Sequence, residues 1–94
     1  MNQTVINYRV YRVRFPGGLK PQLIDSIGQT NRVYINLTSN YPANRMANEI
    51  KKYFQANGDA LEVLIAVGNK MISVERFMVS EKNYYKEFRK HIEK

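Results

Sequence analysis

Residues 61–79, LEVLIAVGNKMISVERFMV, contain two runs of strand-forming residues separated by a short turn. In the first run, apolar residues recur at every second position, which is the period of a β-strand. Gly68 and Asn69 follow, and both residue types tolerate the positive φ angles that a tight hairpin turn requires. The second run, 71–79, is rich in β-branched and large apolar residues. We therefore predict a β-hairpin whose first strand, 61–67, is central and buried on both faces, because its second face is apolar as well.

Two more strands are predicted nearer the N-terminus. Residues 5–15 are rich in aromatic and β-branched side chains and place Tyr11 and Val13 on one face, with arginines on the other. Pro16 and the two glycines after it end this strand, because proline cannot donate to a strand ladder and glycine permits a turn. Residues 32–38 alternate apolar and polar side chains, which predicts a strand with one buried face.

Helices are predicted in three places. The pattern in residues 42–56 is the clearest, since apolar side chains recur at three- and four-residue steps and a glycine-containing stop signal follows. Residues 19–27 form a short helix or, less in keeping with the proline they contain, a short extra strand. A terminal helix begins after Ser80, which is a suitable N-cap, and an apolar stripe runs along it as far as Ile92.

The predicted order is strand, short helix, strand, helix, strand, strand, helix. Both longer helices have a single apolar face, which favours packing on one side of a sheet. We therefore predict the α+β class, as a two-layer sandwich of about four mainly antiparallel strands with two main helices on one face. No repeat, linker or low-complexity run divides residues 1–94, so they are expected to form a single small basic domain.

Composition restricts the classes of partner and compartment. The chain has 15 lysines and arginines against 8 acidic residues, a net charge of +7, which favours polyanionic partners such as nucleic acid or an acidic protein surface. The chain has no cysteine, which excludes disulfides and thiolate metal sites and fits a reducing compartment. No apolar run approaches the roughly 18 residues of a membrane span, and no signal-peptide pattern is present. A cytoplasmic protein without membrane contact is expected.

Candidate catalytic residues are sparse. His91 is the only histidine and lies near a helix end, so we interpret it as a surface residue. Glu62 and Glu75 can face each other across the hairpin, depending on its register, and such a pair is more often an exposed charge pair than an acid/base site. No spacing of carboxylates suits a metal, and Gly17-Gly18 lacks the pattern of a phosphate-binding loop. We therefore predict that the protein is not an enzyme and needs no metal or cofactor.

A group of aromatic and basic side chains is predicted on the first two strands. These side chains fall on the non-core face, and they form an exposed platform if the two strands are neighbours. Tyrosine rings can stack on bases, and arginine can stack or pair with phosphate. The alternative is structural, because tyrosine is a good strand former and arginine keeps an exposed face soluble. The predicted nucleic-acid-binding residues of this platform are Tyr8, Arg12, Arg14, Arg32 and Tyr34.

A second basic surface is predicted on the terminal helix. Its cations recur at helical steps and so share one stripe, which basic residues of the preceding helix extend if the two helices are neighbours. Three glutamates dilute this charge, and a solvated helix face is the alternative interpretation. The residues of this second predicted binding surface are Lys82, Lys86, Arg89 and Lys90.

Two hypotheses about function follow. The first is a non-catalytic nucleic-acid-binding module for RNA or a single strand, although the patterns of the RNA-recognition motif and the KH domain are absent. The second is a protein-interaction module for an acidic partner, such as a small phage- or mobile-element-encoded inhibitor of a host protein. Abundant asparagine, lysine, isoleucine and tyrosine, typical of AT-rich genomes, support that association. A homo-oligomer formed through an exposed sheet edge is compatible with either hypothesis.

Overall fold

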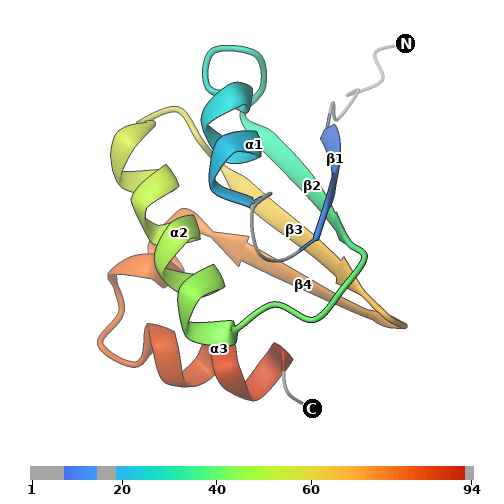
Figure 1. The fold of residues 1–94 in the computed structure, drawn as a ribbon. Coiled ribbons are helices and arrows are strands. Elements are labelled where there is room, and N and C mark those ends of the chain that lie inside the picture. The colour runs from blue at the N-terminus through green and yellow to red at the C-terminus, as the bar shows by residue number, and fades with distance from the viewer. Residues whose placement is uncertain (1–7, 15–18, 93–94) are drawn as a thin grey trace, which may run out of the picture.

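The computed structural model describes residues 8–14 and 19–92. Its helices and strands follow the order predicted for them, with a short 3-10 helix, η1, added after the hairpin (Figure 1). The elements are β1 (Arg9–Val13), α1 (Leu19–Ser26), β2 (Arg32–Leu37), α2 (Ala43–Ala56), β3 (Glu62–Val67), β4 (Lys70–Glu75), η1 (Arg76–Ser80) and α3 (Tyr84–Ile92). Residues 5–7 and Phe15, which were predicted to belong to the first strand, lie outside the described residues.

The four strands form one mixed sheet in the order β1-β2-β3-β4. The pairs β1–β2 and β2–β3 are parallel, and only β3–β4 is antiparallel. The α+β class and the four-stranded sheet are confirmed, but the prediction of mainly antiparallel strands is wrong. The physical reason is that α1 and α2 each return the chain to the end of the sheet where the preceding strand began, so the next strand runs in the same direction.

The hydrophobic core lies between the helices and one face of the sheet. Val33, Ile35, Val63 and Ile65 on that face have no exposed surface. The apolar face predicted for α2 is confirmed, because all five of its residues are buried, and α2 packs between α1 and α3 (Figure 1). These five residues are Met46, Ala47, Ile50, Tyr53 and Phe54.

The hairpin of β3 and β4 has the predicted turn. Gly68 has a φ of +60°, and no described non-glycine residue has a positive φ, so the turn needs a left-handed residue only at its first central position. The register places Glu62 opposite Glu75. The expectation that β3 is buried on both faces is wrong, because Leu64 and Ala66 are only half-buried. The described residues on their face of the sheet are all half-buried or exposed.

The second strand of the hairpin ends at Glu75, four residues before the predicted end. Arg76 turns toward the loop that joins α2 to β3, and its guanidinium donates hydrogen bonds to the carbonyl oxygens of Phe54, Asn57 and Ala60. The chain then forms η1, and α3 begins only at Tyr84. Ser80 therefore ends η1 and does not cap α3, which corrects the predicted helix start. The strand pattern was overridden by this tertiary contact.

Candidate nucleic-acid interface

The face of the sheet opposite the buried core residues, here called the open face, carries the predicted platform. On β1 and β2, which are neighbours, all five predicted residues point away from the buried face, and Val10 pairs with Tyr34 and Arg12 with Asn36. None of the described residues on the open face is buried: Arg12 and Arg14 are exposed, and Tyr8, Arg32 and Tyr34 are half-buried. The structure therefore brings the platform residues together on one surface.

The two tyrosines of the platform contact each other edge to face. The ring centroids of Tyr8 and Tyr34 are 6.4 Å apart, with an angle of 88° between the rings. The Tyr8 hydroxyl donates to Oε1 of Glu62, and this hydrogen bond, together with burial, raises the pKa of Tyr8 above its usual value. Ser73 donates to the other oxygen of Glu62, at 2.5 Å. Tyr8 is thus a neutral hydroxyl at physiological pH, held in place by a carboxylate two strands away.

The arginines of the open face differ in their surroundings. Within the part of the chain that the structure describes, no carboxylate forms an ion pair with Arg12 or Arg14. Arg32 lies opposite Glu62 in the register, so its charge is partly offset. The unbalanced positive charge of the open face is therefore at the end where β1 finishes.

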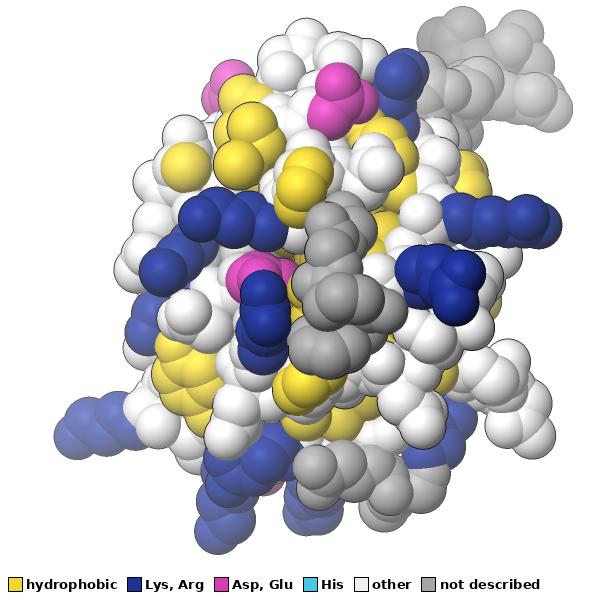
Figure 2. All heavy atoms as spheres, viewed as in Figure 1, with side chains coloured by type: hydrophobic (Ala, Val, Ile, Leu, Met, Phe, Trp, Pro, Cys, Tyr) yellow, Lys and Arg dark blue, Asp and Glu magenta, His cyan; other side chains and the backbone are white. Residues whose placement is uncertain are grey.

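Charge is unevenly distributed between the two ends of the sheet. The parallel strands β1, β2 and β3 finish at one end, here called the carboxyl end, where α1 and α2 begin and α3 finishes. Figure 2 shows most Lys and Arg side chains along the sides and lower part of the molecule, whereas acidic side chains lie near its top, where a basic side chain adjoins them, and in its middle. Basic residues at the carboxyl end are Arg12, Arg14, Lys20, Arg45, Lys70, Arg89 and Lys90. The other end is mixed, because Asp25, Asp59, Glu62 and Glu75 lie there together with Arg9, Arg32 and Arg76.

The second predicted basic surface is only partly assembled. Arg89 donates to the side-chain oxygen of Asn44 at the start of α2, and Lys70 donates to the carbonyl oxygen of Ile92, so the last turn of α3 lies at the carboxyl end. Lys86 is exposed in the middle of α3. Lys82 precedes the helix and lies away from that end, so the predicted stripe of four cations is not continuous.

Two basic residues of the carboxyl end, Lys20 and Lys70, were missed by the sequence analysis, and Arg45 was expected only as an extension of the stripe on the terminal helix. Lys20 and Arg45 lie in the first turns of α1 and α2, and Lys70 begins β4. The signal that could have found them was the strand–helix–strand order, because every helix that joins parallel strands begins at the carboxyl ends of the strands.

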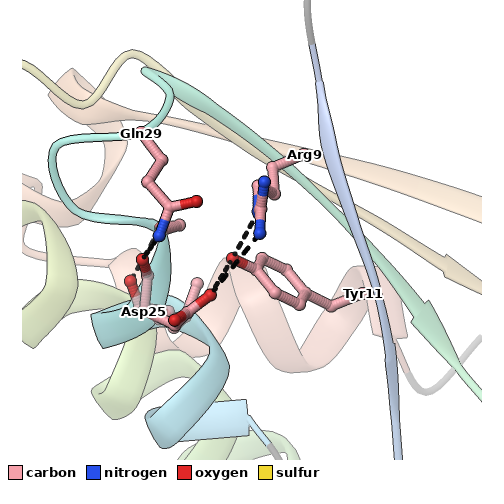
Figure 3. A network of polar contacts seen from close by, with 6 residues as sticks. Arg9, Tyr11, Asp25 and Gln29 are labelled. Carbon is pink, nitrogen blue, oxygen red and sulfur yellow. Dashed lines mark hydrogen bonds and ion pairs between the residues drawn. The ribbon is translucent and has the colours of Figure 1, made fainter.

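A cluster of polar side chains joins β1 to α1 (Figure 3). The Tyr11 hydroxyl donates to Oδ2 of Asp25 at 2.8 Å, Arg9 Nε donates to the Tyr11 oxygen at 3.1 Å, and Gln29 donates to the Asp25 carbonyl oxygen. Burial and the hydrogen bond to Asp25 raise the pKa of Tyr11, so this phenol stays protonated near neutral pH. The cluster fixes the docking of α1 on the sheet.

Other candidate site residues are separate from one another. His91 is exposed, and its Nδ1 lies 2.8 Å from the carbonyl oxygen of Glu87. Within residues 8–14 and 19–92, no three histidine or acidic side chains lie close enough to hold a metal ion. None of the described helices is both long enough and apolar enough to cross a membrane.

Comparison with known proteins gave no relative. No protein-family model matches the chain, and no similar protein was found among the curated proteins or the solved structures compared with it. Function is therefore argued from the surfaces of the molecule alone.

Proposed function

We propose that this chain is a non-catalytic nucleic-acid-binding protein, which holds RNA or another single strand on the open face of its sheet. The observation that carries the proposal is the position of Arg12 and Arg14, which are exposed, unpaired with any described carboxylate, and on the same face of the sheet as the Tyr8–Tyr34 pair. The proposal requires a two-layer arrangement, with the helices on one face and the ligand on the other.

The expected contacts divide by chemistry. Phosphates approach the carboxyl end, where Arg12 and Arg14 offer guanidinium groups. A base stacks on the exposed part of Tyr34, while Tyr8, whose hydroxyl is held by Glu62, supports that ring from its edge. A base on an aromatic ring is bound with little sequence preference, because every base has a flat face. The partner is therefore expected to be a flexible single strand.

Fluorescence anisotropy with labelled single-stranded RNA, single-stranded DNA and a duplex, each at several salt concentrations, tests the proposal. We expect tightest binding to a single strand and affinity that falls steeply as salt rises. The triple variant Arg12→Gln, Arg14→Gln, Arg32→Gln should lower the slope of log K against log salt by about 2 to 3.

A matched control separates the open face from net charge. The variant Lys51→Gln, Lys52→Gln, Lys82→Gln removes the same charge from the helix side, and it should keep most of the affinity. Equal losses in the two triple variants would mean that only bulk charge attracts the nucleic acid. Tyr34→Ala should weaken binding by roughly 5- to 100-fold, the usual range for one stacked base.

A second candidate function is binding to an acidic protein surface, as expected of a small inhibitor. It is favoured by two apolar residues on the same open face, Val10 and Met71, which are 63% and 59% exposed. Exposed apolar side chains beside arginines are common at protein interfaces. Under this alternative, Val10→Ser with Met71→Ser abolishes a stoichiometric complex, whereas nucleic acid binds only weakly and without preference.

A further inference from the structure

A groove lies along the other edge of the sheet, between β4 and α3. It has a volume of about 390 Å³ and is lined mainly by apolar side chains of β4, η1 and α3. Ile72 and Phe88 are buried in its walls, whereas Met71 and Phe77 are each 59% exposed. A groove of this size suits several side chains of an extended chain.

The strand that forms one wall has a free edge. Among the described strands, β4 pairs with β3 alone. Val67 and Lys70 flank a two-residue turn, so they form a hydrogen-bonded pair, and such pairs alternate along the hairpin. The backbone groups of Met71 and Ser73 therefore point away from β3. Between Lys70 and Glu75 this edge has neither a charged residue nor a proline, which are the usual features that prevent an added strand.

The charge of the groove is opposite to that of the molecule. Glu81 and Glu87 line it together with His91, and none of the described residues that line it is a Lys or Arg. In a chain of net charge +7 this surface attracts cations, in contrast to the carboxyl end.

We propose that this groove binds an extended peptide segment of a partner protein, which adds a strand to β4, is apolar at alternate positions and is cationic at its ends. Its backbone pairs with Met71 and Ser73, its apolar side chains enter the groove, and its cations meet Glu81 and Glu87. A second copy of this chain fits less well, because it carries the same charge of +7 and its own β4 edge is flanked by α3. The proposal is independent of nucleic-acid binding on the open face.

The test is a titration of ¹⁵N-labelled protein with a synthetic peptide of about eight residues, slightly longer than β4, in which valine alternates with threonine and each end carries lysine. We expect amide shifts at Met71, Ser73 and Phe77. Glu81→Gln with Glu87→Gln should weaken binding about tenfold, and Ser73→Pro should weaken it further. Proline is tolerated there because the lost N–H points away from β3.

Two control peptides keep the test independent of protein folding. A peptide with methylated backbone nitrogens at alternate residues cannot pair with β4, and one with glutamate in place of lysine should be repelled; both should bind at least tenfold more weakly. The proposal is overturned if the three peptides bind equally, if no shift is seen near 1 mM peptide, or if the shifts map to β1 and β2 and not to β4. Concentration-dependent shifts of the same amides without peptide would overturn it in favour of a second copy.

Discussion

At the scale of single residues, Tyr41 links stability to pH. Its hydroxyl donates to Oε1 of Glu49 at 2.7 Å, and burial together with this hydrogen bond raises the pKa of Tyr41 from 10.0 to about 12. The folded state therefore holds this proton more tightly than the unfolded state, and the stabilisation is complete below pH 10 and lost as pH rises toward 12.

Replacing Tyr41 should separate the contribution of its hydrogen bond to stability from the pH dependence that its raised pKa causes. We expect Tyr41→Phe to lose about 1 kcal/mol of unfolding free energy near pH 8, where the hydrogen bond is intact, and to show a shallower decline above pH 10. Urea unfolding at both pH values measures this. Tyr34→Phe, at a half-buried position, serves as the control, and an equal decline in the Tyr41 variant and the wild type would contradict the assignment.

Arg76 is the second residue that organises its surroundings. Its guanidinium is 5.3 Å from the centre of the Phe54 ring and satisfies three carbonyl groups around the end of α2. We expect Arg76→Met to cost about 2 to 3 kcal/mol, because these carbonyls lose their donors. Arg76→Lys should retain less than half of the stability that Arg76→Met loses, since one ammonium group cannot replace the planar, multiple-donor guanidinium. As a control, Arg12→Met on the open face should change the free energy of unfolding by less than about 0.5 kcal/mol, and urea unfolding measures all three variants.

At the scale of elements, two glycines can be compared: Gly68 lies in the hairpin turn and Gly58 in the loop between α2 and β3. A Cβ added at Gly68 or at Gly58 meets nothing within 4 Å, but only Gly68 has a positive φ. Gly68→Ala should therefore cost about 1 to 2 kcal/mol from conformation alone, whereas Gly58→Ala should be neutral or slightly stabilising. Thermal unfolding of both variants measures the difference, and equal costs would show that the turn tolerates a side chain.

Element types were predictable from the sequence, but strand direction was missed. Periodicity located β2, α2 and β3 within a residue or two because each has one strongly apolar face. The polar residues Tyr34 and Asn36 made β2 resemble an antiparallel strand with one solvent-exposed face, whereas parallel strands are usually covered on both faces. The polar residues of the open face therefore led to the wrong prediction of strand direction, and the same face carries the proposed binding surface.

Tertiary contacts decided the remaining features of the fold and the candidate site. Nothing local in the run 71–79 shows that Arg76 finds carbonyl partners 16 to 22 residues earlier in the chain. The platform on β1 and β2 was predictable from alternation once the strands were assumed to be neighbours. The groove beside β4 was not predictable from the sequence, because it depends on the angle at which α3 packs after η1.

At the scale of the whole molecule, the uneven distribution of charge predicts opposite effects of two similar variants. Arg14→Glu places an acid among the cations of the carboxyl end and should raise the Tm by roughly 1 to 3 °C at low salt, by relieving repulsion. Arg32→Glu would place a third carboxylate in register with Glu62 and Glu75 and should lower the Tm. Both shifts should shrink at 0.5 M salt, where screening is nearly complete. Salt-independent shifts would contradict an electrostatic origin.

The sheet order also has a consequence for how the chain folds. The β3–β4 pairing closes only a two-residue loop, whereas β1 and β2 can pair only after α1 has been laid between them. Long loops are closed late because their ends are costly to bring together. We therefore expect amides of β3 and β4 to gain protection first in pulse-labelled refolding, and β1 last. On the ribosome, the strand that is synthesised first would wait unpaired the longest.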